Sequence, residues 1–140
     1  DKLDKHVYLE KIVDSLDFNL KHHTIVVKGT INNQNVRLGI DTAAEFNQLK
    51  YFIPKKRLRL TGIGKRKIEV LAGKLHRVKL SETTYFGPML TVLTNLSKMN
   101  EAFGTNLDGI LGYEFFAQKR TIINYQKEKL YFINYPLNHQ

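Results

Sequence analysis

The stretch Leu38-Gly39-Ile40-Asp41-Thr42-Ala43-Ala44 decides how this 140-residue chain is interpreted. Its apolar residues continue an alternation that begins at Val36 and places three apolar side chains on one face of a strand. The preceding segment Thr24–Ile31 is rich in β-branched residues, and the polar run Asn32–Asn35 between the two is typical of a turn. The sequence therefore predicts a hairpin that delivers Asp41 to the end of its second strand.

A second informative stretch, Leu107–Phe116 (LDGILGYEFF), contains a short apolar run that stops at Gly112. The residues after this glycine, Tyr113–Lys119, are good helix formers and predict one helix of about two turns. The chain closes on a predicted hairpin, with strands at Thr121–Tyr125 and Leu130–Tyr135. Further strands are predicted at Ile68–Leu71, Leu75–Leu80 and Met89–Leu96, separated by Gly73 and by Phe86-Gly87-Pro88. Many short strands with a single short helix predict an all-β sandwich or barrel.

Taken in order, these segments resemble the lobe of an aspartic protease, in particular the single-lobed, bacterial-type, retropepsin-like family. The stretch around Asp41 is similar to the family's apolar strand running into Asp-Thr-Gly-Ala, and Leu107–Phe116 is similar to its apolar-apolar-Gly strand and the helix after it. Thr61-Gly62-Ile63-Gly64 stands where the family has its flap hairpin. The resemblance covers roughly residues 18–135, and its specificity lies in the order of the motifs, which are about 70 residues apart.

The resemblance implies a closed, strongly curved antiparallel β-barrel with one short helix. It places a single protease-like domain at residues 18–137 and an N-terminal extension at residues 1–17. The residues that it assigns are the catalytic Asp41; the active-site loop Thr42, Ala43 and Ala44; the substrate-binding flap Gly62, Ile63 and Gly64; and a structural motif beside the site, Asp108, Gly109, Ile110, Leu111 and Gly112.

Peptide hydrolysis without a metal or a covalent nucleophile explains why a carboxylate stands at Asp41. Two facing carboxylates that share one proton can deprotonate a water and protonate the amide oxygen, because like charges so close cannot both ionise. The chain has one aspartate of this kind, so the resemblance implies a homodimer, with Thr42 bracing one active-site loop against its twin. Asp108 precedes Gly-Ile-Leu-Gly, a place where the family's residue serves structure. The plainer interpretation of Asp41 is a turn or cap residue after a strand.

One departure from the family pattern bears on activity: Ala43 stands where the family has glycine. If the site requires a backbone angle that only glycine adopts easily, the alanine costs on the order of 1 kcal/mol. Two functions therefore stay open, an endopeptidase and a catalytically weak or inactive peptide-binding or regulatory domain on the same fold. A third is a basic adaptor that uses the cluster of seven Lys and Arg residues between positions 55 and 67.

Composition removes several other classes of function. The chain has no cysteine, which excludes disulfides, thiol catalysis and cysteine-ligated zinc. The adjacent His22 and His23 have no further ligands at metal-binding spacing, so no metal and no cofactor is expected. The net charge is +9, but the basic cluster contains no aromatic residue for stacking, which disfavours nucleic acid. No apolar run approaches the ~20 residues of a membrane span. We expect a peptide or protein substrate, and a location that is cytoplasmic, or periplasmic or secreted if a leader was removed.

Overall fold

The computed structural model describes residues 12–50, 56–61, 67–118 and 120–133, and nearly all of its regular structure is β. The strands are β1 (Ile12–Asp17), β2 (Asn19–Lys21), β3 (Thr24–Ile31), β4 (Gln34–Ile40), β5 (Asn47–Leu49), β6 (Lys56–Thr61), β7 (Lys67–Leu75), β8 (Val78–Lys79), β9 (Tyr85–Phe86), β10 (Met89–Leu93), β11 (Gly109–Leu111), β12 (Arg120–Asn124) and β13 (Lys129–Ile133). The helices are α2 (Ser97–Phe103) and α3 (Tyr113–Phe116). The predicted all-β class is confirmed.

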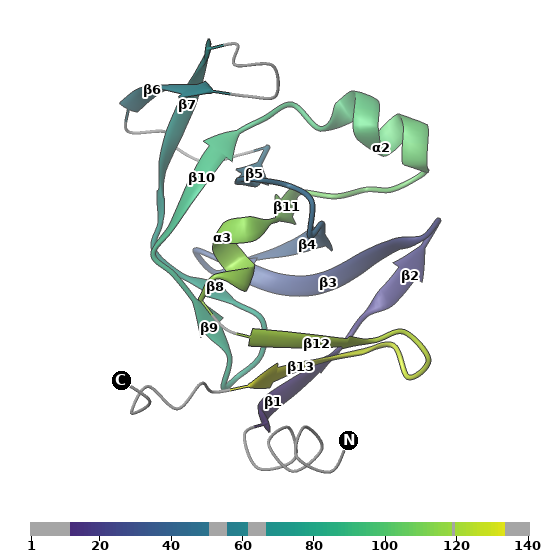
Figure 1. Cartoon of the computed structure of the whole chain (residues 1–140). Coiled ribbons are helices and arrows are strands. Elements are labelled where there is room, and N and C mark those ends of the chain that lie inside the picture. The colour runs from purple at the N-terminus through teal and green to yellow at the C-terminus, as the bar shows by residue number, and fades with distance from the viewer. Residues whose placement is uncertain (1–11, 51–55, 62–66, 119, 134–140) are drawn as a thin grey trace.

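The strands form one large curled sheet and one small sheet. The large sheet has the order β6-β7-β10-β5-β11-β4-β3-β8-β9, with β2 also paired to β3, and the small sheet has the order β1-β13-β12. Figure 1 shows the β6–β7 hairpin at one end of the molecule and the small sheet at the other. The connection from β4 to β5 lies between them, near the middle (Figure 1).

The β3–β4 hairpin forms as the sequence predicts. Its antiparallel register runs from Ile25 opposite Ile40 to Ile31 opposite Gln34. The turn is shorter than the predicted Asn32–Asn35, because only Asn32 and Asn33 lie between the strands. Both have positive φ, 51° and 64°, a conformation that asparagine tolerates better than most residues and that two-residue hairpin turns require.

Two strand pairs differ from the antiparallel sheet that the sequence predicts. β11 runs parallel to β4, with Gly109 opposite Leu38 and Leu111 opposite Ile40. β10 runs parallel to β5. Parallel neighbours cannot be joined by a tight turn, so local sequence patterns give no sign of these pairs. The consequence for the site is that β4 and β11 end side by side.

The predicted helix boundaries are also corrected. α3 ends at Phe116, whereas the sequence predicted a helix as far as Lys119. α2 was not predicted at all: it has only seven residues, too few for a periodicity argument, and its apolar contact with the core is limited to the partly buried Met99. β7 passes through Gly73, where the sequence predicted a break between two strands.

An aromatic cluster fixes α3 and with it the end of β11. Phe115 on α3 is fully buried, and its ring centroid lies 4.2 Å from that of Phe86 and 6.1 Å from that of Phe132. Burying one such side chain stabilises the fold by roughly 1.5–3 kcal/mol, and a ring pair adds about 1 kcal/mol. The turn at Gly112 is therefore anchored between a buried strand and a buried aromatic residue.

The segment before residue 18 is not wholly outside the domain. Residues 12–17 of the predicted extension form β1, which pairs antiparallel with β13. The Asp14 carboxylate accepts hydrogen bonds from the hydroxyls of Ser81 (2.9 Å), Thr83 (2.7 Å) and the buried Thr84, and so ties this strand to the loop before β9. Within the described part of the chain, no helix is long and apolar enough to cross a membrane.

Candidate active site

Asp41 follows the last residue of β4 and lies beside the end of β11. Its backbone N–H donates to the carbonyl oxygen of Leu111 at 3.0 Å, which continues the parallel β4–β11 ladder by one residue. The sequence predicted that Asp41 and the segment 110–112 are neighbours, and they are. The side chain of Asp41 is exposed, so a buried, paired strand ends in a carboxylate that faces solvent.

The loop after Asp41 folds back on its own carboxylate. Oδ1 of Asp41 accepts the backbone N–H of Ala43 at 2.9 Å, and the Asp41 carbonyl oxygen accepts the N–H of Ala44 at 3.2 Å. A side-chain oxygen that accepts an N–H two residues ahead makes an Asx turn, which is the local preference of aspartate after a strand. These two bonds fix the orientation of the carboxylate from within the loop.

Gly112 lets the loop approach the end of β11. A Cβ on this residue would lie 2.5 Å from the carbonyl oxygen of Ala44 and 2.9 Å from its Cβ, so any larger residue would push the two segments apart. The same Ala44 carbonyl accepts the N–H of Tyr113 at 2.8 Å. The active-site loop therefore rests on the turn between β11 and α3.

Ala43 is accommodated without strain in its backbone. It is not among the residues with positive φ in the described part of the chain, so its conformation does not demand glycine. Its methyl group belongs to an exposed residue, as does the side chain of Thr42. The N–H that binds the Asp41 carboxylate is one that alanine supplies as well as glycine.

Asp108 stands at the opposite end of β11 from Gly112 and is held by its own neighbours. Its Oδ2 accepts the backbone N–H of Arg37 at 2.8 Å, and its Oδ1 lies 3.1 Å from the ammonium nitrogen of Lys50. Because β4 and β11 are parallel, Asp41 and Asp108 are separated by about four residues, or about 13 Å along the strands. They are too far apart to share a proton.

Asn47 is a buried polar residue of the site, and no pattern in the sequence indicates it. Its side-chain oxygen accepts the N–H of Gly112 at 2.8 Å, and its amide nitrogen lies 3.3 Å from the sulfur of Met89. The residue is 1% exposed. It satisfies a backbone group at the end of β11 from the neighbouring strand β5, a pairing that becomes visible only in three dimensions.

A mostly apolar pocket of about 230 Å³ opens beside Asp41. Besides Asp41 itself, none of the described residues that line it is acidic. Phe103, at the end of α2, lines the pocket and is 54% exposed, so its ring is accessible to a ligand in the pocket. The described lining residues are His23, Thr24, Gly39, Ile40, Asp41, Met99, Phe103, Leu107 and Ile110.

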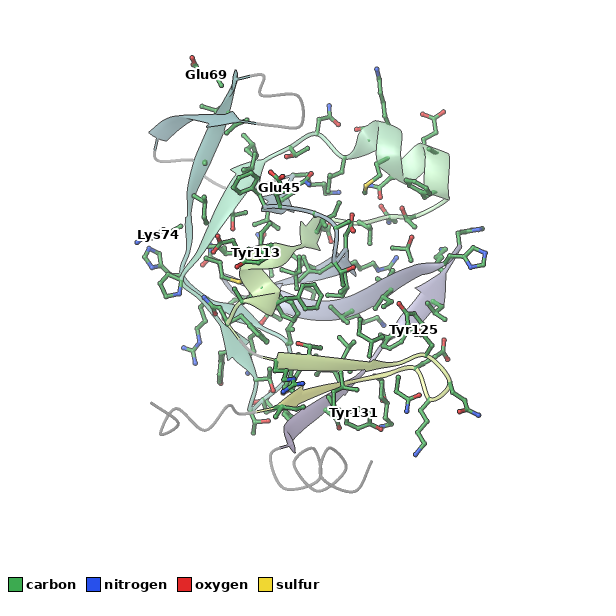
Figure 2. The ribbon with its side chains drawn as sticks, viewed as in Figure 1. Glu45, Glu69, Lys74, Tyr113, Tyr125 and Tyr131 are labelled. Carbon is green, nitrogen blue, oxygen red and sulfur yellow. The ribbon has the colours of Figure 1, made fainter. Side chains whose placement is uncertain are left out.

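The predicted flap corresponds to the β6–β7 hairpin. Its strands are antiparallel, and their register runs from Lys56 opposite Ala72 to Thr61 opposite Lys67. Gly62, Ile63 and Gly64 lie outside the described residues, and so do the side chains of the basic cluster between positions 55 and 67. Glu69, labelled in Figure 2, marks the same end of the molecule. Among the described residues, no group of three or more His, Asp or Glu side chains could hold a metal ion.

Comparison with solved structures places this arrangement among known folds. A retropepsin-like aspartic protease from Rickettsia conorii superimposes with a TM-score of 0.54 at 14% identity, over 85% of this chain and 88% of that one. The retroviral protease-like domain of Ddi1 from Leishmania major superimposes with a TM-score of 0.52 at 17% identity, over 84% of this chain and 98% of that one. This chain has the retropepsin-like fold. The resemblance predicted from the sequence is thereby confirmed for the fold.

Similarity at the level of sequence is much weaker. No protein-family model matches the chain, and no curated protein sequence matches it. At 14% and 17% identity the shared retropepsin-like fold carries no information about substrate or activity. Function has to be argued from the site.

Proposed function

We propose that this retropepsin-like domain is an aspartic endopeptidase whose active site forms between two copies of the chain. The observation that carries the proposal is the state of Asp41. Its carboxylate is exposed, oriented by the Ala43 N–H, and set at the end of a buried parallel strand pair. Because no second acid lines its pocket among the described residues, the partner carboxylate comes from Asp41 of a second copy.

The chemistry follows from two carboxylates that hold one proton. The ionised carboxylate takes a proton from water, and the water oxygen attacks the peptide carbonyl carbon. The protonated carboxylate donates its proton to the carbonyl oxygen, which gives a neutral tetrahedral diol. The carboxyl group that took the proton from water then donates it to the amide nitrogen, and the other carboxylate removes a proton from one hydroxyl of the diol. The C–N bond breaks, a carboxylic acid and an amine are released, and the pair again holds one proton. In this scheme the pair acts as one unit, so neither copy has a fixed role as acid or base.

The surroundings of Asp41 support an extended peptide as the substrate. The pocket lined by Met99, Phe103 and Leu107 suits an apolar side chain next to the scissile bond. The β6–β7 hairpin acts as the flap that closes over the peptide backbone, and Gly62, Ile63 and Gly64 stand between its two strands in the sequence. Thr42 and its loop, which are exposed in the single chain, meet their symmetry copies in the dimer.

Replacing Asp41 by asparagine tests the proposal directly. Asp41→Asn should reduce cleavage of an unstructured protein substrate by at least about a thousandfold, because an amide can neither ionise nor share the proton. Asp17→Asn is the matched control and should cleave the substrate as fast as the parent. Asp17 is the last residue of β1, and its side chain is 83% exposed. Cleavage that survives Asp41→Asn would exclude the proposed site.

A further inference from the structure

A chain of hollows follows the outer face of β3 and β4 away from Asp41. A pocket of about 290 Å³ adjoins the Asp41 pocket, because Leu107 lines both. A third pocket, of about 430 Å³, adjoins the second, because Lys28, Arg37 and Asn106 line both. The three lie in a row along one sheet face, with Leu107 between the first two, and we refer to this row of pockets as the groove. In Figure 1 this face is on the β2–β3–β4 side of the molecule, away from the β6–β7 hairpin.

The far end of this groove carries an unneutralised positive charge. Lys28 and Arg37 are directly opposite each other in the β3–β4 register, where like charges destabilise a sheet. Lys21, on the adjacent β2, lines the second pocket but not the third, and it pairs with Thr24 at the end nearer Asp41. All three side chains are exposed, and none makes an ion pair with a described residue. The fold thus keeps a repulsive cross-strand pair that an anion would relieve.

The nearby acids do not supply that anion. Asp108 lines the third pocket, but its two oxygens are already engaged by Lys50 and by the backbone N–H of Arg37. Glu128 accepts the N–H of Leu20 at 3.4 Å and lines neither pocket. The positive charge of Lys21, Lys28 and Arg37 is therefore free to act on a ligand.

The dimensions of the groove fit an extended peptide. Arg37 lies four residues before Asp41 on the same strand, or about 13 Å, which is the length of about four residues of extended chain. Between the two ends the floor is apolar, with Val26 and Leu107. None of the described lining residues of the second and third pockets is aromatic, so the groove lacks the stacking surface that single-stranded nucleic acid uses.

We propose that this groove binds an acidic segment of a peptide, about four residues away from the residue held in the Asp41 pocket. Carboxylate side chains of the peptide pair with Lys28, Arg37 and Lys21, while its apolar residues cover the floor. The inference rests on the proposed function for the direction of the groove toward a scissile bond. The binding of acidic peptide itself does not require catalysis.

The test is a binding measurement on the Asp41→Asn variant, which separates recognition from cleavage. Labelled decapeptides carry a central Leu-Phe and a block of three glutamates either before or after it, and matched peptides carry glutamine instead. In at least one order, the glutamate peptide should bind about tenfold more tightly than its glutamine counterpart at low salt, and salt should erase the difference. Lys28→Gln and Arg37→Gln should each weaken glutamate-peptide binding about threefold, and together about tenfold.

Lys74→Gln is the matched control, because Lys74 is an exposed lysine on β7, on the opposite side of the molecule in Figure 2. It should change affinity by less than about twofold, and the stability of the groove variants should match or exceed that of the parent. Three results would overturn the inference. The glutamate and glutamine peptides bind equally well, or Lys74→Gln weakens binding as much as the groove variants do, or the groove binds an oligothymidine in preference to the peptides. None of these results bears on whether Asp41 cleaves peptides, which the cleavage assay decides separately.

Discussion

Asp41 shows how little local sequence is needed to orient a carboxylate at the end of a strand. An aspartate after a strand tends to accept the N–H two residues ahead, and here Ala43 provides it at 2.9 Å. The same geometry serves an ordinary turn, so the loop by itself does not distinguish a catalytic from a structural aspartate. What distinguishes the two is the exposure of the carboxylate beside a pocket, together with the fixed end of β11 at Gly112.

Ala43 can be tested by restoring the family's glycine. Because Ala43 does not have a positive φ, Ala43→Gly should leave kcat/KM within about twofold. It should lower the free energy of unfolding by about 0.4–1 kcal/mol, since glycine gives the unfolded chain more freedom. Peptide cleavage and urea unfolding measured on the same preparations check both values. A gain in activity of tenfold or more would show that the alanine methyl group does obstruct the site.

Gly112→Ala is the complementary change. The added methyl group would meet the Ala44 carbonyl oxygen at 2.5 Å, so the loop that carries Asp41 must shift. We expect a loss of about 1–3 kcal/mol in stability, and a loss of activity larger than that of Ala43→Gly. Thermal unfolding and cleavage rates at a temperature where both variants are folded separate the two effects. Unchanged stability and activity would mean that the contact between Gly112 and Ala44 is not as close as the structure has it.

Among the elements, local patterns predicted some features and missed others for physical reasons. The β3–β4 hairpin and the closing β12–β13 hairpin are antiparallel neighbours in sequence, and alternation with turn residues revealed both. The β4–β11 pair joins segments about 70 residues apart; the family resemblance implied that they are neighbours, but not that they run parallel. α2 is only seven residues long, too short for its periodicity to be recognised, and no sequence pattern indicates the hydrogen bond between buried Asn47 and Gly112.

The C-terminal segment is another part of the chain whose role becomes clear only from the strand pairing. The sequence of Tyr131–Leu137 is rich in apolar and aromatic residues, a composition that by itself would suit a dimer surface. Residues 131–133 instead belong to β13, between β1 and β12, and Phe132 and Ile133 are buried within the chain. Residues 134–137 lie outside the described residues. Deleting residues 131–140 would therefore remove core residues, so the deletion could not separate a loss of assembly from a loss of folding.

The attachment of β1 leads to a prediction about stability. Asp14→Ala should lower the free energy of unfolding by about 2 kcal/mol, because the buried Thr84 hydroxyl and two others lose their acceptor. Asp17→Ala on the same strand is the control: its ion pair with Lys129 is exposed and should be worth less than about 0.5 kcal/mol. Chemical denaturation of both variants gives the comparison. Equal effects would show that β1 is not anchored through Asp14.

For the whole molecule, the proposed activity depends on the symmetry of a dimer. Each chain has one exposed Asp41 after β4, and Asp108 is too distant to serve as its partner. A site made from one residue per copy needs an isologous dimer, in which the same surface is used on both sides. A specific dimer normally buries about 1,600 Å² in total, so assembly and activity should both depend on protein concentration.

The most direct test mixes the parent with the inactive Asp41→Asn variant at equal amounts and a concentration where dimers form, and allows the subunits to exchange. If each site needs Asp41 from both copies, random pairing leaves about one quarter of the dimers active, so activity per total protein should fall to about one quarter of the undiluted parent. Asp17→Asn protein at the same amount should leave the activity undiminished. A mixture that retains one half of the parent activity would show that each chain acts alone, which would contradict the shared site.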